Sequence, residues 1–322
     1  MDWLLVLAGL GLLLVGGEAL VRGASGVALA ARLSPAVVGL TIVAAGTSMP
    51  ELVVSLQAAM EGSPGLAVGN VVGSNLFNVG MILGLTALVV PLRILGNSVK
   101  LEWPVMMLAS FQLVLLARDG TVDRLEGGFL VTALVAFVAY AVWVARTGTT
   151  SAEAEEFEDL PTASFGRTGA TAVWLNVGAI LVGVGLLAGG STALVHGAVG
   201  IASALGVSDA VIGLTVVAAG TSSPELVTSL VAARRGRDDV AVANVLGSNV
   251  FNVLGIAGLT AVVHPLPVPD EIIARDAWWM LGMCAVLFPF MRRRMRLGRA
   301  EGAMLFGAFV VYLGLLIHDA LG

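Results

Sequence analysis

The chain has 322 residues, of which 57% are hydrophobic and 12% are charged, and its formal net charge is −5. A soluble domain carries about 25% charged residues, so this composition excludes a water-soluble globule and a disordered chain. The negative charge argues against a nucleic-acid partner, and the single cysteine excludes a disulfide framework. We therefore expect a protein that crosses a lipid bilayer several times.

Apolar runs long enough to span a membrane, about 20 residues each, occur ten times along the chain. The expected fold is therefore an all-α polytopic membrane protein with ten transmembrane helices. The expected spans lie near residues 3–31, 36–60, 65–90, 101–117, 128–146, 171–205, 210–233, 239–263, 275–291 and 302–318.

The positions of the basic residues predict the orientation. With the N-terminus outside, only three of the 17 basic residues fall on the outer side, and the other 14 fall on the inner side. Those three are Arg118, Arg124 and Arg275. Because inner loops carry the excess of Lys and Arg, we expect a multi-pass protein of the cell (inner or plasma) membrane with both termini outside.

Two sequence blocks occur twice at the same separation. Residues 39–56 read GLTIVAAGTSMPELVVSL and residues 213–230 read GLTVVAAGTSSPELVTSL, with 15 of 18 positions identical. Residues 69–80 read GNVVGSNLFNVG and residues 243–254 read ANVLGSNVFNVL, with eight of 12 identical. Both pairs lie 174 residues apart, so the chain is an internal duplication.

Each half holds five expected spans, and an odd number means that the second copy enters the membrane from the opposite side. We therefore predict two inverted repeats, 1–146 and 169–322, joined by an acidic cytoplasmic linker at 147–168. The motif regions are 39–80 and 213–254. Inverted repeats with interrupted helices are typical of secondary transporters, with the binding site at the repeat interface.

Each GTSxPE motif carries a proline four residues after a glycine, at Pro50 and Pro224. Proline has no backbone N–H and clashes with the preceding turn. We therefore expect both helices to break and to release the carbonyl groups near Ala44 and Ala218 from the helical ladder. Further oxygen atoms at the two breaks come from Thr47, Ser48, Thr221 and Ser222.

The two acidic residues that follow these prolines, Glu51 and Glu225, are the central candidates for the site. A carboxylate at the middle of a membrane costs about 2.5–3.5 kcal/mol, and no Lys or Arg lies near either one in sequence. Each therefore needs a cation or a proton. Glu18 differs, because Arg22 four residues later can pair with it, and we exclude it from the site.

The two GSNxFN blocks place a serine and an asparagine four residues apart on one helical face. These residues are Ser74 and Asn78 in the first block and Ser248 and Asn252 in the second. Asn75 and Asn249 are interpreted as interhelical contacts and the methionines as core packing. Asn70 and Asn244 could be ligands or structural residues, and we favour the structural role. Carboxylate, hydroxyl, amide and carbonyl oxygens without His or Cys favour Ca²⁺, Mg²⁺ or Na⁺ over zinc or copper.

With GTSMPEL at 46–52 and GTSSPEL at 220–226, each followed by GSNxFN, the chain resembles the sodium/calcium exchangers of the calcium/cation antiporter superfamily. The resemblance implies four cation sites in a diamond around Glu51 and Glu225. It also implies a first and a sixth helix that slide across the others. Potassium-dependent relatives carry Asp at the position of Asn252, so we expect no potassium coupling.

The expected function is a Na⁺/Ca²⁺ antiporter, with Ca²⁺ and Na⁺ as substrates and the bilayer as its surroundings. We expect no catalytic residues, no enzyme activity, no cofactor beyond the transported ions, and no need for an oligomer. A cation/H⁺ antiporter of the same fold is the alternative, although proton-coupled relatives carry a GNxxE-type motif. A passive channel and an intramembrane protease are disfavoured, the latter because HExxH and a Ser/His dyad are missing.

Overall fold

The protein is described here from a computed structural model, and most of the residues that it describes are helical. Within the described residues, eight helices are long and apolar enough to cross a membrane, and a ninth span results if the pair bent by 50° at Ser48 counts as one. The predicted linker, apart from Thr147, and the start of the span expected at 210–233 lie outside the described residues. The structure describes residues 2–31, 35–62, 64–147, 170–205 and 218–321.

The helices of the two halves follow the same order along the chain. The first half contains α1 (Asp2–Ala31), α2 (Pro35–Val38), the π-helical η1 (Gly39–Val43), α3 (Ala44–Thr47), α4 (Met49–Met60), α5 (Pro64–Phe77), the π-helical η2 (Asn78–Leu83), α6 (Gly84–Val89), the π-helical η3 (Ser98–Glu102), α7 (Trp103–Leu116), the 3-10 turn η4 (Ala117–Asp119) and α8 (Arg124–Thr147). The second half contains α10 (Ala170–Ala204), α12 (Ala218–Thr221), α13 (Ser223–Arg234), α14 (Asp238–Val250), the π-helical η6 (Phe251–Ala257), α15 (Gly258–Val263), the π-helical η7 (Ile272–Asp276), α16 (Ala277–Arg292) and α17 (Arg299–Leu321).

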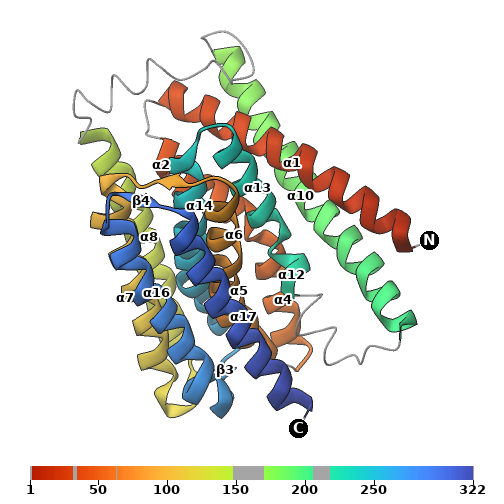
Figure 1. Cartoon of the computed structure of the whole chain (residues 1–322). Coiled ribbons are helices and arrows are strands. Elements are labelled where there is room, and N and C mark those ends of the chain that lie inside the picture. Colours follow the sequence, from red (N-terminus) through yellow and green to blue (C-terminus); the bar gives the residue numbers. More distant parts are fainter. Residues whose placement is uncertain (1, 32–34, 63, 148–169, 206–217, 322) are drawn as a thin grey trace.

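The helices that carry the GSNxFN motifs, α5 and α14, form the centre of the molecule (Figure 1). In the spans that begin with them, 78% and 83% of the most apolar stretch is buried, against 22–39% in the other candidate spans. The surrounding helices α7, α8, α16 and α17 expose large apolar side chains such as Phe111, Tyr140, Trp278 and Val311, as expected for contact with lipid chains.

The two longest helices, α1 and α10, pack side by side along one flank of the bundle (Figure 1). Glycines on both helices recur every seventh residue and place backbone against backbone. A Cβ atom on Gly9 would lie 2.8 Å from the carbonyl oxygen of Gly190, and one on Gly16 would lie 3.0 Å from that of Gly183. The contacts run in opposite directions along the two helices, so the pair is antiparallel.

Two short antiparallel strand pairs join the halves at the ends of the helices. Strand β1 (Leu92–Arg93) pairs with β4 (Arg296–Leu297), and β2 (Thr121–Val122) pairs with β3 (Leu266–Pro267). The apolar pattern of the sequence did not indicate these strands, because two residues are too few to show a period of two. Each pair links one half to the other and ties their loops together.

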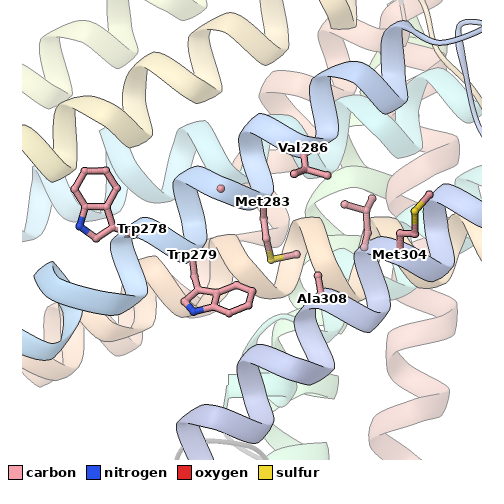
Figure 2. A pocket seen from close by; sticks show the side chains of 8 residues that line it. Trp278, Trp279, Met283, Val286, Met304 and Ala308 are labelled. Atoms are coloured by element: carbon pink, nitrogen blue, oxygen red, sulfur yellow. The ribbon is translucent and has the colours of Figure 1, made fainter.

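An apolar hollow of about 390 Å³ lies between α16 and α17 (Figure 2). Trp278, Trp279, Met283 and Val286 line it from α16, and Met304 and Ala308 line it from α17. Its lining contains neither of the two buried glutamates nor any of the motif hydroxyls. The hollow therefore suits hydrocarbon rather than an ion and is separate from the candidate site.

We predict that the close packing of α1 and α10 makes Gly183→Ala destabilising. The new Cβ atom would lie 2.7 Å from the Leu20 amide nitrogen and 2.9 Å from the Gly16 carbonyl oxygen, and such overpacking costs about 1–3 kcal/mol. Gly185→Ala is the control, because nothing lies within 4 Å of its Cβ position. Thermal unfolding in detergent should show a lower Tm for Gly183→Ala alone, and equal Tm values for the two variants would contradict the prediction.

Candidate cation site

Both GTSxPE segments break their helices one residue before a new helical turn. Ser48 (φ −83°, ψ 8°) separates α3 from α4, and Ser222 (φ −86°, ψ 8°) separates α12 from α13. The prolines stand at the start of the new helices, where the missing N–H is not needed. Glu51 and Glu225 follow in the first turn, where the positive end of the helix dipole favours a carboxylate.

The two glutamates are held by serines from the opposite half of the chain. The Ser222 hydroxyl donates to Glu51 Oε1 at 2.9 Å, and the Ser48 hydroxyl donates to Glu225 Oε1 at 2.8 Å. Both glutamates are 1% exposed. The structure therefore brings the two candidate carboxylates to one buried place, each bonded across the interface between the halves.

The second oxygen of each carboxylate, Oε2, is buried and has no hydrogen-bond partner. The salt bridges formed by the described residues lie elsewhere, at Glu18, Asp276 and Asp319. A buried carboxylate without a partner is strongly unfavourable in a medium of low dielectric constant. The two Oε2 atoms are thus free to bind a cation or a proton.

The GSNxFN motifs add further oxygen atoms next to the carboxylates. Ser74 Oγ lies 3.4 Å from the Ser222 hydroxyl, and the buried Ser248 side chain lies beside Glu225. Asn78 and Asn252 are each 1% exposed, and neither Oδ1 atom has a hydrogen-bond partner. These residues lie where α5 and α14 pass into the π-helical η2 and η6, and π-helical turns are frequent at functional sites.

The remaining predicted ligands lie on the short helices before the breaks. Thr47 is fully buried in α3, and its hydroxyl lies 3.2 Å from the Ala44 carbonyl oxygen and 3.4 Å from Asn244 Oδ1. Thr221 is buried at the end of α12, and Ala218 is the first residue of that helix. All of these residues therefore lie within one turn of a helix break.

The structure narrows one sequence-based expectation about the carbonyl groups of this segment. The Ala44 carbonyl is not released from the helical ladder, because the Ser48 amide donates to it at 3.0 Å. The helix continues as far as Ser48, and the carbonyl that loses its donor to Pro50 is that of Gly46, four residues earlier. The Ala44 oxygen can still use its second lone pair, so its role as a ligand stays a prediction.

Two asparagines that were not assigned to the site stabilise the backbone at the glutamates. Asn70 Nδ2 donates to the Glu51 carbonyl oxygen at 3.2 Å and to the Ser55 hydroxyl at 2.9 Å. The equivalent Asn244 Nδ2 donates to the Glu225 carbonyl oxygen at 3.4 Å and to the Ser229 hydroxyl at 2.9 Å. These bonds agree with a structural role, and the duplication of both Asn and Ser at an offset of 174 is the signal that predicts them.

The predicted pairing of Glu18 with Arg22 is confirmed. Its carboxylate pairs with Arg22 in the same helix, as the spacing predicted, and also with Arg235 at the end of α13. The second partner was not predicted, because the two residues are 217 positions apart in the chain. The ion pairs link α1 to the end of α13.

Comparison with known proteins extends over nearly the whole chain. The family model described as "Sodium/calcium exchanger protein" matches residues 1–143 and 175–318. A protein of Alkalimonas amylolytica named "Putative antiporter CaxA" is 37% identical over 319 residues, which cover 98% of each chain. The sodium/calcium exchanger MaX1 of Methanosarcina acetivorans is 29% identical over 98% of this chain and 99% of its own.

A solved structure has the same fold. A structure of the sodium-calcium exchanger NCX_Mj, soaked with Na⁺ and Ca²⁺, matches with a TM-score of 0.82 and 27% sequence identity, and the match covers 97% of both chains. With its apolar helices, the chain is therefore a multi-span membrane protein, and it belongs to the sodium/calcium exchanger protein family.

Proposed function

We propose that this protein is a secondary antiporter that exchanges Na⁺ for Ca²⁺ by alternating access. The observation that carries the proposal is the pair of buried carboxylates, Glu51 and Glu225, each held by a serine of the other half and each with a free oxygen. Their formal charge of −2 is neutralised by one Ca²⁺. Because Na⁺ ions would use the same oxygens, the two cations compete, and the competition produces exchange.

The proposed ligands are all oxygen atoms, which suits Ca²⁺ and Na⁺. In the described structure the carboxylate, hydroxyl and amide members of the set are buried around the helix breaks. The set comprises Glu51, Glu225, Thr47, Thr221, Ser48, Ser222, Ser74, Ser248, Asn78, Asn252 and the carbonyl groups of Ala44 and Ala218.

The architecture supports ten spans arranged as two inverted repeats. The equivalent helices α1 and α10 contact one another in antiparallel directions, as inverted repeats require when both helices cross the membrane. The broken span at Ser48 has its counterpart at the break at Ser222, which separates α12 from α13. Both halves of the site come from one chain, so we propose that exchange needs no oligomer. From the distribution of the basic residues, we also propose that both termini lie outside the cell.

The packing also supports a movement of α1 and α10 as one body. Leu13 and Leu20 of α1 and Ile180 and Leu187 of α10 belong to a hydrophobic cluster that is distinct from the core around α5 and α14. The cluster also contains Val38 of α2 and Val43 of η1. Because α1 and α10 pack backbone to backbone and reach the core around α5 and α14 through Val21 of α1, the pair can move as one body and give up few core contacts. Such a movement would open the site alternately to either side, as alternating access requires.

Removal of either carboxylate should abolish exchange. Glu51→Gln and Glu225→Gln each leave a charge of −1, which cannot neutralise Ca²⁺, while the side chain still accepts the serine hydrogen bond. We expect sodium-dependent ⁴⁵Ca²⁺ uptake into vesicles to fall to background with the Tm in detergent maintained. The matched control is Glu61→Gln, an exposed carboxylate after α4. Full uptake by both site variants would refute the proposal.

The driving ion separates the proposal from a cation/H⁺ antiporter of the same fold. The name of the 37%-identical relative specifies an antiporter without its ions, so both gradients need to be tested. Vesicles with purified protein should accumulate Ca²⁺ when a sodium gradient is imposed and should remain at the level without a gradient when only a pH gradient is imposed. The opposite pattern would establish proton coupling and refute sodium coupling.

A further inference from the structure

Four asparagines meet at the centre of the bundle, where α5 and η2 face α14 and η6. Asn75, Asn78, Asn249 and Asn252 are each 1% exposed. We propose that Asn75 and Asn249 are positioning residues that set the amide orientation of Asn252 and Asn78, so that both carbonyl oxygens face the cations. This inference rests on the proposed cation exchange and identifies residues outside the ligand set.

The orientation starts from partners that can only accept hydrogen bonds. Asn75 Nδ2 lies 3.4 Å from the Asn249 carbonyl oxygen and 3.6 Å from Met280 Sδ. Asn249 Nδ2 lies 3.4 Å from the Asn75 carbonyl oxygen and 3.5 Å from Met106 Sδ. Carbonyl oxygens and thioether sulfurs never donate, so the amide nitrogens must face them and the Oδ1 atoms must face the other way.

Asn75 and Asn249 in turn set the amide orientation of the two candidate ligands, Asn252 and Asn78. Asn75 Oδ1 accepts a hydrogen bond from Asn252 Nδ2 at 3.0 Å, and Asn249 Oδ1 accepts one from Asn78 Nδ2 at 2.9 Å. An amide oxygen cannot donate, so Asn252 and Asn78 must turn their nitrogens toward it. Each of these hydrogen bonds therefore has only one possible donor and one possible acceptor.

The series of hydrogen bonds ends at two amide oxygens that have no hydrogen-bond partner. Oδ1 of Asn78 and Oδ1 of Asn252 are buried without a hydrogen-bond partner, one helical turn from Ser74 and Ser248. If either amide turned over, an N–H group would point where a cation is to bind and would repel it. The orientation therefore decides whether these side chains bind or repel a cation.

The chain of hydrogen bonds begins on helices that supply no proposed ligand. Met106 belongs to α7 and Met280 to α16, and they are 0% and 1% exposed. They lie 174 residues apart, at equivalent positions of the duplication. The interpretation of these two methionines as core packing is thus incomplete, because each sulfur also accepts a hydrogen bond from a central amide.

The test measures the apparent KM for Ca²⁺ of sodium-dependent uptake in vesicles. Asn75→Ala removes the acceptor for Asn252, so we expect the KM to rise about tenfold, equivalent to about 1.4 kcal/mol, while Vmax per folded transporter stays within about twofold. In an Asn252→Asp background both ends of the side chain are oxygens, so orientation no longer matters. There Asn75→Ala should cause no rise in KM.

A milder variant tests the sulfur and avoids the risk of misfolding. Met280→Leu keeps an apolar side chain of similar volume and removes one acceptor from the Asn75 amide. We expect the KM for Ca²⁺ to rise about threefold, as for the loss of a weak hydrogen bond. The matched control is Met283→Leu in the same helix, for which no hydrogen bond to an asparagine is expected to be lost and the KM should not change.

The outcomes separate the two proposals. If the unmodified protein shows no sodium-dependent Ca²⁺ uptake, the proposed function fails and this inference fails with it. If uptake is present but Asn75→Ala leaves the KM unchanged, or raises it equally in the Asn252→Asp background, only the positioning role is overturned. The same holds if Met280→Leu and Met283→Leu behave alike. A rise in KM that the Asn252→Asp background suppresses supports the role.

Discussion

The burial of two like charges is the constraint on which the rest of this structure depends. Glu51 and Glu225 are almost fully enclosed, and each is stabilised by a serine hydroxyl that the other half provides. Neither half can complete this arrangement alone. The hydroxyls stand at the helix breaks, so a proline that interrupts each helix is as necessary to the site as the carboxylates themselves.

This mutual dependence extends outward from the glutamates. At the centre, Asn75 and Asn249 each donate to the backbone carbonyl of the other. At the ends of the helices, each strand pair joins one strand of the first half to one of the second. In a duplicated chain, a contact that is favourable once occurs twice, which reinforces the packing of the two halves. The α1–α10 pair packs mainly in a second hydrophobic cluster, so the molecule combines a deeply buried centre with a flank that reaches this core through few residues, such as Val21.

The agreement between sequence and structure is closest where a local rule applies. The breaks lie at the predicted motifs, because proline and glycine act on their own backbone, and the pairing of Glu18 with Arg22 follows from one helical turn. The Ala44 carbonyl keeps its hydrogen bond for a local reason, since Pro50 removes only the donor that would reach Gly46, and Ser48 retains the N–H that bonds to Ala44. Arg235 lay beyond prediction, because it meets Glu18 only after folding.

The sequence by itself determined the class of protein, the duplication, the helix breaks and the residue types at the site. Hydropathy, proline chemistry and a repeated motif are properties of neighbouring residues, so they can be read without coordinates. Only the tertiary structure decided which serine meets which glutamate, and which way the buried amides face. Those relations join residues more than 170 positions apart, and they arise when the two halves pack and every buried donor must find an acceptor.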